Sequence, residues 1–313
     1  MFSLALTFRF FTITRLFALL ALVVLATACH TMPRLVRKNQ EVHIATVNNN
    51  VCKRLEGKVV LYAIFVDSRH TNPWSTYDIT STLDSIRLGM DWLEAEAREI
   101  GVPLDITLDY HQTAKEVAPI AVNLPRKTLY NSLLVPNGVR GLDRWADKIG
   151  RAALQTFGPD TASITKTKIK PKDRERLLAR LRDKHKTDNV ALVYFINNYY
   201  SDEISLALHT GQDDTPEYAI VSYKQPSVIV HEFLHLFGAL DLYVSPWDSK
   251  RKAQRRKAMA MKEFPNEIMA FAHRNLDDLE ISSLTQYLIG WQPAMKEEHQ
   301  RLIAGKRYRF AKY

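Results

Sequence analysis

The pattern of apolar and polar positions predicts several strands. Residues 58–66 form a continuous β-branched and aromatic run, which is typical of a buried strand. Residues 104–110 alternate between apolar and polar positions, as a half-buried strand does, and residues 189–197 form a second strongly apolar run. We expect shorter strands at residues 204–208 and 218–223.

Helical spacing separates these runs. Between Ser81 and Ile100 the apolar residues recur at the spacing of one helix face, and Gly101 ends this predicted helix. Residues 174–184 predict another helix, and residues 227–237 predict a mostly apolar helix buried in the core. Residues 111–165 mix helix signals with Pro and Gly, so we assign no element there. This order predicts an α+β domain with a mixed sheet.

The first 28 residues resemble a signal peptide. Residues 16–25 are apolar but too short to span a membrane, and residues 26–28 have the small-x-small pattern that a signal peptidase accepts. Cys29 follows directly, and the stretch that it ends resembles a bacterial lipobox, with the large aliphatic residue four places before the cysteine rather than three. We therefore expect a secreted protein that is lipidated on Cys29. Ordinary cleavage would instead leave Cys29 free or paired with Cys52.

Composition and charge limit the remaining possibilities. The chain has 46% apolar and 25% charged residues, as ordinary globular proteins do. Its formal net charge is +9, which suggests affinity for an anionic envelope surface or for acidic substrates. The basic stretch 166–186 contains acidic residues and lacks aromatic ones, so we expect a solvated helix face and no nucleic-acid partner. We expect residues 29–56 to be a tether and residues 57–313 to form the folded domain.

One segment carries recognisable chemistry. His231 and His235 are four residues apart, so on a helix their rings leave the same face one turn apart and can bind one ion. Glu232 follows the first histidine, and its side chain leaves the helix axis about 100° away. From there its carboxylate can reach a metal-bound water without ligating the metal. The alternative is a buried helix with two core histidines.

A catalytic zinc ion usually has three protein ligands and a water, so two histidines leave one ligand missing. Gly238 lies three residues after His235, where a left-handed residue would turn the chain out of the helix. The chain could then return and bring Asp241 to the metal as a carboxylate ligand.

The pattern His231-Glu232-x-x-His235-x-x-Gly238-x-x-Asp241 resembles the metzincin zinc peptidases, in the snapalysin-like variant where Asp replaces the usual third His. The resemblance covers about residues 218–291. It implies a zincin-like fold with an active-site helix, and division of the domain into an N-terminal subdomain of about residues 57–238 and a smaller, helical C-terminal subdomain of about residues 239–313.

The resemblance also implies particular structural features. A tight turn carrying a methionine should lie beneath the metal, and residues 266–270 suit this turn, with Met269 as its methionine. The strand at 218–223 would be the edge strand that pairs with an extended substrate. A helix near residues 279–288 would close the C-terminal subdomain.

Two points differ from the family or stay open. Some metzincins have a Tyr two residues after the turn methionine, where this chain has Phe271, so Tyr243 could serve as the oxyanion donor instead. A gluzincin-like plan would take Glu267 or Glu280 as the third ligand, although Gly238 favours Asp241. The basic run at residues 250–257 would border the substrate pocket in a metzincin, and is expected to be a solvated helix face.

These features together predict a zinc-dependent metalloendopeptidase of the cell envelope or the extracellular space, which acts on peptide or protein substrates. One catalytic Zn²⁺ would be bound by His231, His235 and Asp241, with Glu232 as the general base. An N-terminal lipid would hold the protein on the membrane. The alternatives are an inactive binding module with the same fold and a basic envelope-surface lipoprotein.

Overall fold

A computed structural model describes most of the chain from the end of the predicted tether onward: residues 54–113, 116–125, 127–128, 136–157, 172–197, 205–208, 217–243 and 250–303. The predicted signal peptide, Cys29 and Cys52 lie outside the described residues. Among the helices described, none is long and apolar enough to cross a membrane.

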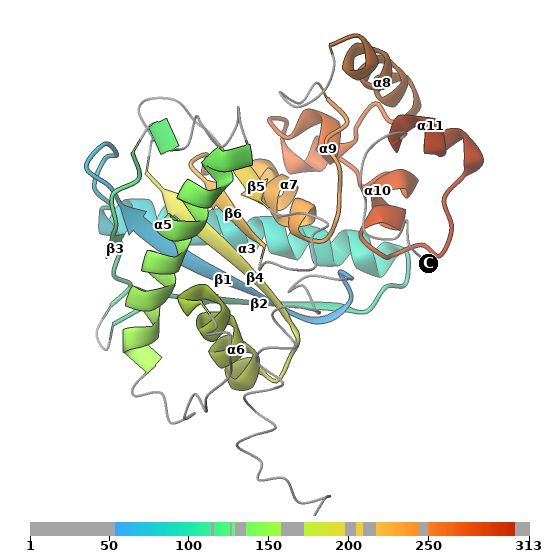
Figure 1. Ribbon diagram of the computed structural model, residues 1–313. Coiled ribbons are helices and arrows are strands. Elements are labelled where there is room, and N and C mark those ends of the chain that lie inside the picture. Colours follow the sequence, from blue (N-terminus) through green and yellow to red (C-terminus); the bar gives the residue numbers. More distant parts are fainter. Residues whose placement is uncertain are drawn as a thin grey trace, which may run out of the picture. The chain divides into compact units, whose positions relative to one another are not determined.

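The described residues form an α+β fold around a mixed sheet (Figure 1). The strand order is β2 (Leu104–Tyr110), β1 (Gly57–Asp67), β4 (Asn189–Ile196), β6 (Tyr218–Val221) and β5 (Leu206–Leu208). The first four strands are parallel and β5 is antiparallel to β6. The short strand β3 (Ile120–Ala121) pairs with the end of β1.

The central strands are apolar because helices cover both faces of the sheet. All residues from Val59 to Val66 in β1 are at most 2% exposed, as expected for a strand buried on both faces. The four residues of β6 are also buried, and β6 lies between β4 and β5. The expectation that residues 218–223 form the edge strand is therefore wrong, and β5 occupies the edge.

Two pairs of helices pack on the sheet (Figure 1). Helix α3 (Thr76–Glu99) packs against β2 and α7 (Pro226–Leu236), and α7 also contacts β5 and β6. Helices α5 (Pro136–Leu154) and α6 (Asp173–His185) cover the opposite face. The 3-10 turn η1 (Gln155–Phe157) extends α5.

The expected solvated basic face holds only in part on α6: Lys184 is exposed, whereas two arginines are buried. The side chain of Arg174 is fully buried, with Nη1 3.2 Å from Asp143 Oδ1 and the guanidinium 4.8 Å from the centre of the Tyr218 ring. Arg182 is also buried and donates to the carbonyl of Asp188. Arg174 holds α6 against α5 and the sheet, because its acidic and aromatic partners compensate its burial.

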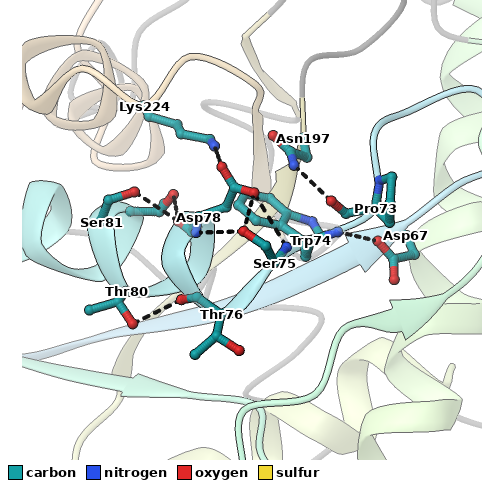
Figure 2. A network of polar contacts seen from close by, with 11 residues as sticks. Asp67, Pro73, Trp74, Ser75, Thr76, Asp78, Thr80, Ser81, Asn197 and Lys224 are labelled. Carbon is teal, nitrogen blue, oxygen red and sulfur yellow. Dashed lines mark hydrogen bonds and ion pairs between the residues drawn. The ribbon is translucent and has the colours of Figure 1, made fainter.

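A polar network joins the ends of the central strands to the start of α3 (Figure 2). The Trp74 indole donates to the carbonyl of Val66 at 3.1 Å. Ser75 caps α3 and forms a capping box with Asp78. The Asp78 carboxylate also accepts from Lys224 Nζ at 2.7 Å, which ties the loop before α7 to α3.

The C-terminal part of the chain is helical. It contains α8 (Lys250–Glu263), α9 (Ile268–Phe271), η3 (Leu276–Asp278), α10 (Ser283–Leu288), η4 (Glu297–His299) and α11 (Gln300–Ile303). The helix expected near residues 279–288 is shorter than predicted, because Ser282 caps α10 and accepts from the Thr285 amide. Leu55 is fully buried and exchanges hydrogen bonds with Ile289 and Trp291, so these residues join β1 to the helical part.

Candidate metal centre

The predicted motif lies on α7, a helix whose sequence explains its start and its burial. Pro226 occupies the first turn, where its missing amide proton costs nothing. The helix is apolar on nearly all sides, and Gly89 of α3 lets the two helices approach closely. A Cβ atom at Gly89 would lie 2.9 Å from Val230 Cγ2 and 3.2 Å from the Pro226 carbonyl oxygen. The motif helix is therefore held rigidly in the core.

Gly238 ends α7 in a Schellman motif. Its φ angle is +106°, a conformation that side-chain-bearing residues rarely adopt. The Gly238 amide donates to the His235 carbonyl at 3.0 Å, and the Ala239 amide donates to the Leu234 carbonyl at 3.2 Å. The chain consequently leaves the helix axis at once and returns past His235.

This turn brings the three predicted ligands together. One ligand atom from each of His231, His235 and Asp241 lies within 4.8 Å of the other two. Asp241 Oδ1 is 3.3 Å from His231 Nε2 and 3.0 Å from His235 Nε2. The two Nε2 atoms are themselves 3.1 Å apart. Zinc bonds of roughly 2.0–2.2 Å in a tetrahedral site would separate such atoms by roughly 3.3 Å.

The outer nitrogens of both histidines bind backbone carbonyls. His231 Nδ1 is 3.2 Å from the Ile268 oxygen, and His235 Nδ1 is 2.8 Å from the Ala239 oxygen. A carbonyl only accepts, so each Nδ1 carries a proton, and a ring in its neutral form presents a lone pair at Nε2. Two facing lone pairs cannot bond each other. Either a proton on one Nε2 or a cation between the rings would bridge the two atoms, and metal-binding histidines show this same outer hydrogen bond.

Charge at the site is concentrated in a small buried volume. Burial lowers the pKa of His235, but the carboxylate of Asp241 and its hydrogen bond outweigh this and raise it to about 9. Burial likewise opposes ionisation of Asp241, yet the two histidines hold its pKa well below the usual range. Asp241 is therefore anionic and lies beside two imidazoles, and this set of groups would suit zinc as a ligand set.

Glu232 lies beside this cluster without joining it. The residue is 5% exposed, and its Oε2 atom is buried and has no hydrogen-bond partner among the described residues. Burial raises the pKa of Glu232, and the nearby His231 and His235 oppose that rise. An unpaired buried carboxylate is costly to maintain, which favours a role in chemistry over a role in packing.

Comparisons with known proteins assign the chain to no family. No protein-family model, curated protein or solved structure matches the chain. Interpretation of the site therefore depends on its own residues.

The segment formed by Ile268 and Met269 packs against the site through its backbone carbonyls. The Ile268 carbonyl orients His231, and the Met269 carbonyl accepts from the Leu242 amide at 3.0 Å, next to Asp241. Met269 itself is fully buried. The segment thus contacts both the first ligand and the chain that carries the third.

Glu267 anchors this segment and is absent from the ligand cluster. It is fully buried and accepts from the Met269 amide, the Ser282 amide and the Thr285 hydroxyl at 3.0, 2.7 and 3.1 Å. Burial raises its pKa, while these donors act in the opposite direction. Glu280, the other rival ligand, has an exposed side chain and is absent from the cluster as well.

Tyr243 lies against two of the predicted ligands, His231 and Asp241. Its ring stacks on that of His231 with the centres 5.9 Å apart. Burial, the charges of Asp241 and Glu232, and a hydrogen bond to Asp241 raise the pKa of its hydroxyl. Phe271 occupies the position where some metzincins have a Tyr, and its ring faces the Arg274 guanidinium at 3.8 Å. The sequence did not identify the orienting carbonyls of Ile268 and Ala239, because backbone acceptors carry no residue signature.

Proposed function

We propose that the chain is a zinc-dependent metallopeptidase of the metzincin-like, zincin type, with His231, His235 and Asp241 as the metal ligands. The observation that carries the proposal is the convergence of His231 Nε2, His235 Nε2 and a carboxylate oxygen of Asp241. The Nδ1 atom of each histidine already has a backbone carbonyl as its hydrogen-bond partner, which leaves Nε2 for a metal. The adjacent buried Glu232 supports catalysis rather than metal storage.

When bound, Zn²⁺ would polarise the substrate carbonyl and make water more acidic. Glu232 Oε2 then accepts the proton of the attacking water and returns it to the leaving amine. Tyr243 is placed beside His231 and Asp241, where its hydroxyl can donate to negative charge that develops on the substrate. Gly238 and the Met269 segment contribute by holding the ligands in position.

The sheet offers a place for an extended substrate. Strand β5 lies at the end of the strand order and contacts α7. A peptide could add to such an edge through backbone hydrogen bonds and run past the motif helix. This role passes from residues 218–223, which the sequence suggested, to residues 206–208.

The same proposal places the protein in the cell envelope or outside the cell. It rests on the signal-peptide pattern of residues 1–28 and the lipobox-like position of Cys29. A peptide or protein would be the substrate, and an N-terminal lipid would provide membrane attachment.

Zinc content and peptidase activity of the purified chain test the proposal, with Asp241→Ala, Glu232→Ala and the exposed control Asp277→Ala. We expect zinc in the wild type and the control, no zinc in Asp241→Ala, and retained zinc without activity in Glu232→Ala. Zinc without activity in the wild type would support the binding-module alternative. Absence of zinc together with salt-dependent binding to anionic vesicles would favour the envelope-surface lipoprotein.

A further inference from the structure

We propose a second zinc site, formed by Glu263, Glu298 and His299 in the C-terminal helical part. Glu263 is the last residue of α8, and Glu298 and His299 belong to η4. One ligand atom from each residue lies within 4.8 Å of the other two. No residue is shared with the motif on α7, so this proposal does not depend on the proposed peptidase activity.

His299 is the residue that requires an explanation. Its side chain is 2% exposed, and neither ring nitrogen has a hydrogen-bond partner among the described residues. Leaving a buried polar nitrogen unpaired destabilises the fold. Edge-to-face packing on Phe264, with ring centres 5.0 Å apart, holds the imidazole in this position. A buried imidazole is therefore held in place with no hydrogen-bond partner among the described residues.

The unpaired nitrogen points toward two carboxylates. His299 Nε2 lies 3.6 Å from Glu263 Oε1 and 3.9 Å from Glu298 Oε1. Both separations are too long for a direct hydrogen bond, which would bring the atoms to about 2.7–3.2 Å. They are close to the roughly 3.3 Å that separates two ligands of a tetrahedral zinc ion. The spacing thus suits an ion between the groups better than a contact between them.

The two carboxylates and one imidazole of this cluster indicate which metal it would bind. Two carboxylates neutralise the charge of a divalent cation, which matters on a helix as basic as α8. An imidazole nitrogen disfavours Ca²⁺ and Mg²⁺, which prefer oxygen ligands, and favours zinc. The Glu263 and Glu298 side chains are 48% and 65% exposed, so water can complete the coordination.

Such an ion would link the end of α8 to η4 and α11. These elements lie far apart in sequence, and α8 contacts α11 directly. Binding of zinc to the folded chain alone would stabilise this arrangement in proportion to the logarithm of the zinc concentration. We therefore assign the second site a structural role.

Zinc equilibrium dialysis of the full chain, followed by metal analysis, tests the inference. The main variant is Glu263→Gln/Glu298→Gln, because both side chains are exposed and their replacement spares the core. Glu297→Gln is the matched control: this glutamate is the exposed neighbour of Glu298 and is absent from the cluster. His231→Ala/His235→Ala reports on the motif site independently. Circular dichroism checks that each variant is folded.

We expect about two zinc ions per chain in the wild type and in Glu297→Gln, and about one in each double variant. Zinc retained at the wild-type level in Glu263→Gln/Glu298→Gln overturns the second site, as does equal loss in Glu297→Gln. If the motif site alone fails, zinc falls to zero in Glu263→Gln/Glu298→Gln and is unchanged in His231→Ala/His235→Ala. The two proposals are thereby separated. Cobalt substitution, read from the visible absorption of the bound ion, gives a second measurement of the same counts.

Discussion

Replacement of Glu267 by Gln tests whether this residue supports the site or ligates the metal. In the wild type, Oε1 accepts from the Met269 amide and the Thr285 hydroxyl, and Oε2 accepts from the Ser282 amide. The glutamine oxygen can keep the two bonds at Oε1, but its NH₂ group then faces the Ser282 amide. One buried donor is left unpaired, which costs about 1–3 kcal/mol.

We therefore expect Glu267→Gln to lower the free energy of unfolding by about 2 kcal/mol. In a domain of this size that corresponds to roughly 4–8 °C in melting temperature. Urea denaturation measures the free energy, and metal analysis of the folded variant measures its zinc. Glu280→Gln, on the exposed residue that bridges to Glu267, is the control and should change stability by less than about 0.5 kcal/mol.

Two results would refute this reasoning. A Glu267→Gln variant as stable as the control would mean that the three accepted hydrogen bonds do not hold the segment. A folded variant that loses its zinc would make Glu267 the third ligand, as in the gluzincin plan. Retained zinc with reduced stability is the outcome that the structure predicts.

Three further predictions concern the surroundings of the site. Gly238→Ala forces a side chain into a backbone with φ of +106° and should cost about 1–2 kcal/mol, with weaker zinc retention, as measured by urea denaturation and chelator competition. Gly89→Ala places a methyl 2.9 Å from Val230 Cγ2 and should cost about 1–3 kcal/mol in the same denaturation assay, whereas Leu88→Ala on the exposed side of α3 should cost less. Lys224→Met removes the main partner of Asp78. The pKa of Asp78 is lowered to about 2, and its hydrogen bond with Lys224 is the largest cause. A lowered carboxyl pKa stabilises the fold above about pH 4 and ceases to do so as the pH falls toward 2, so the wild type and Lys224→Met should differ in melting temperature at pH 6 and converge near pH 2. A difference that persists at pH 2 would contradict this assignment.

The sequence predicts the main strands because strands buried on both faces of a sheet consist almost entirely of apolar residues. The runs at residues 58–66 and 189–197 are apolar on both faces, and the structure places them as β1 and β4 in the middle of the sheet. The edge assignment failed for residues 218–223 because it came from the family resemblance. The continuous apolar sequence of β6 was itself the signal for an interior strand.

Helix boundaries depended on capping signals that periodicity does not contain. The predicted start at Ser81 was five residues late, since Ser75 and Asp78 form the capping box of α3. Ser282 similarly marks the start of α10. The burial of Arg174 was unpredictable locally, because its partner Asp143 lies on a different helix.

One part of the candidate site could be predicted from the sequence and another could not. Spacing within residues 231–241 was enough to predict which side chains would converge, since one helix turn and one glycine determine their relative positions. The segment at residues 266–269 has no such fixed spacing to the motif. Its contribution comes through the carbonyl oxygens of Ile268 and Met269, which any residue would supply.

The hydrogen-bond partners of His231 and His235 bear on whether the pair is purely structural. A core histidine needs its two nitrogens satisfied, and Nδ1 of both His231 and His235 already is. A proton on His235 Nε2 can be shared with Asp241 Oδ1 at 3.0 Å and with His231 Nε2 at 3.1 Å. That proton leaves Glu232 Oε2 buried beside the pair without a donor among the described residues. A divalent cation would accept the lone pairs of two neutral histidines and would bring water within reach of that carboxylate.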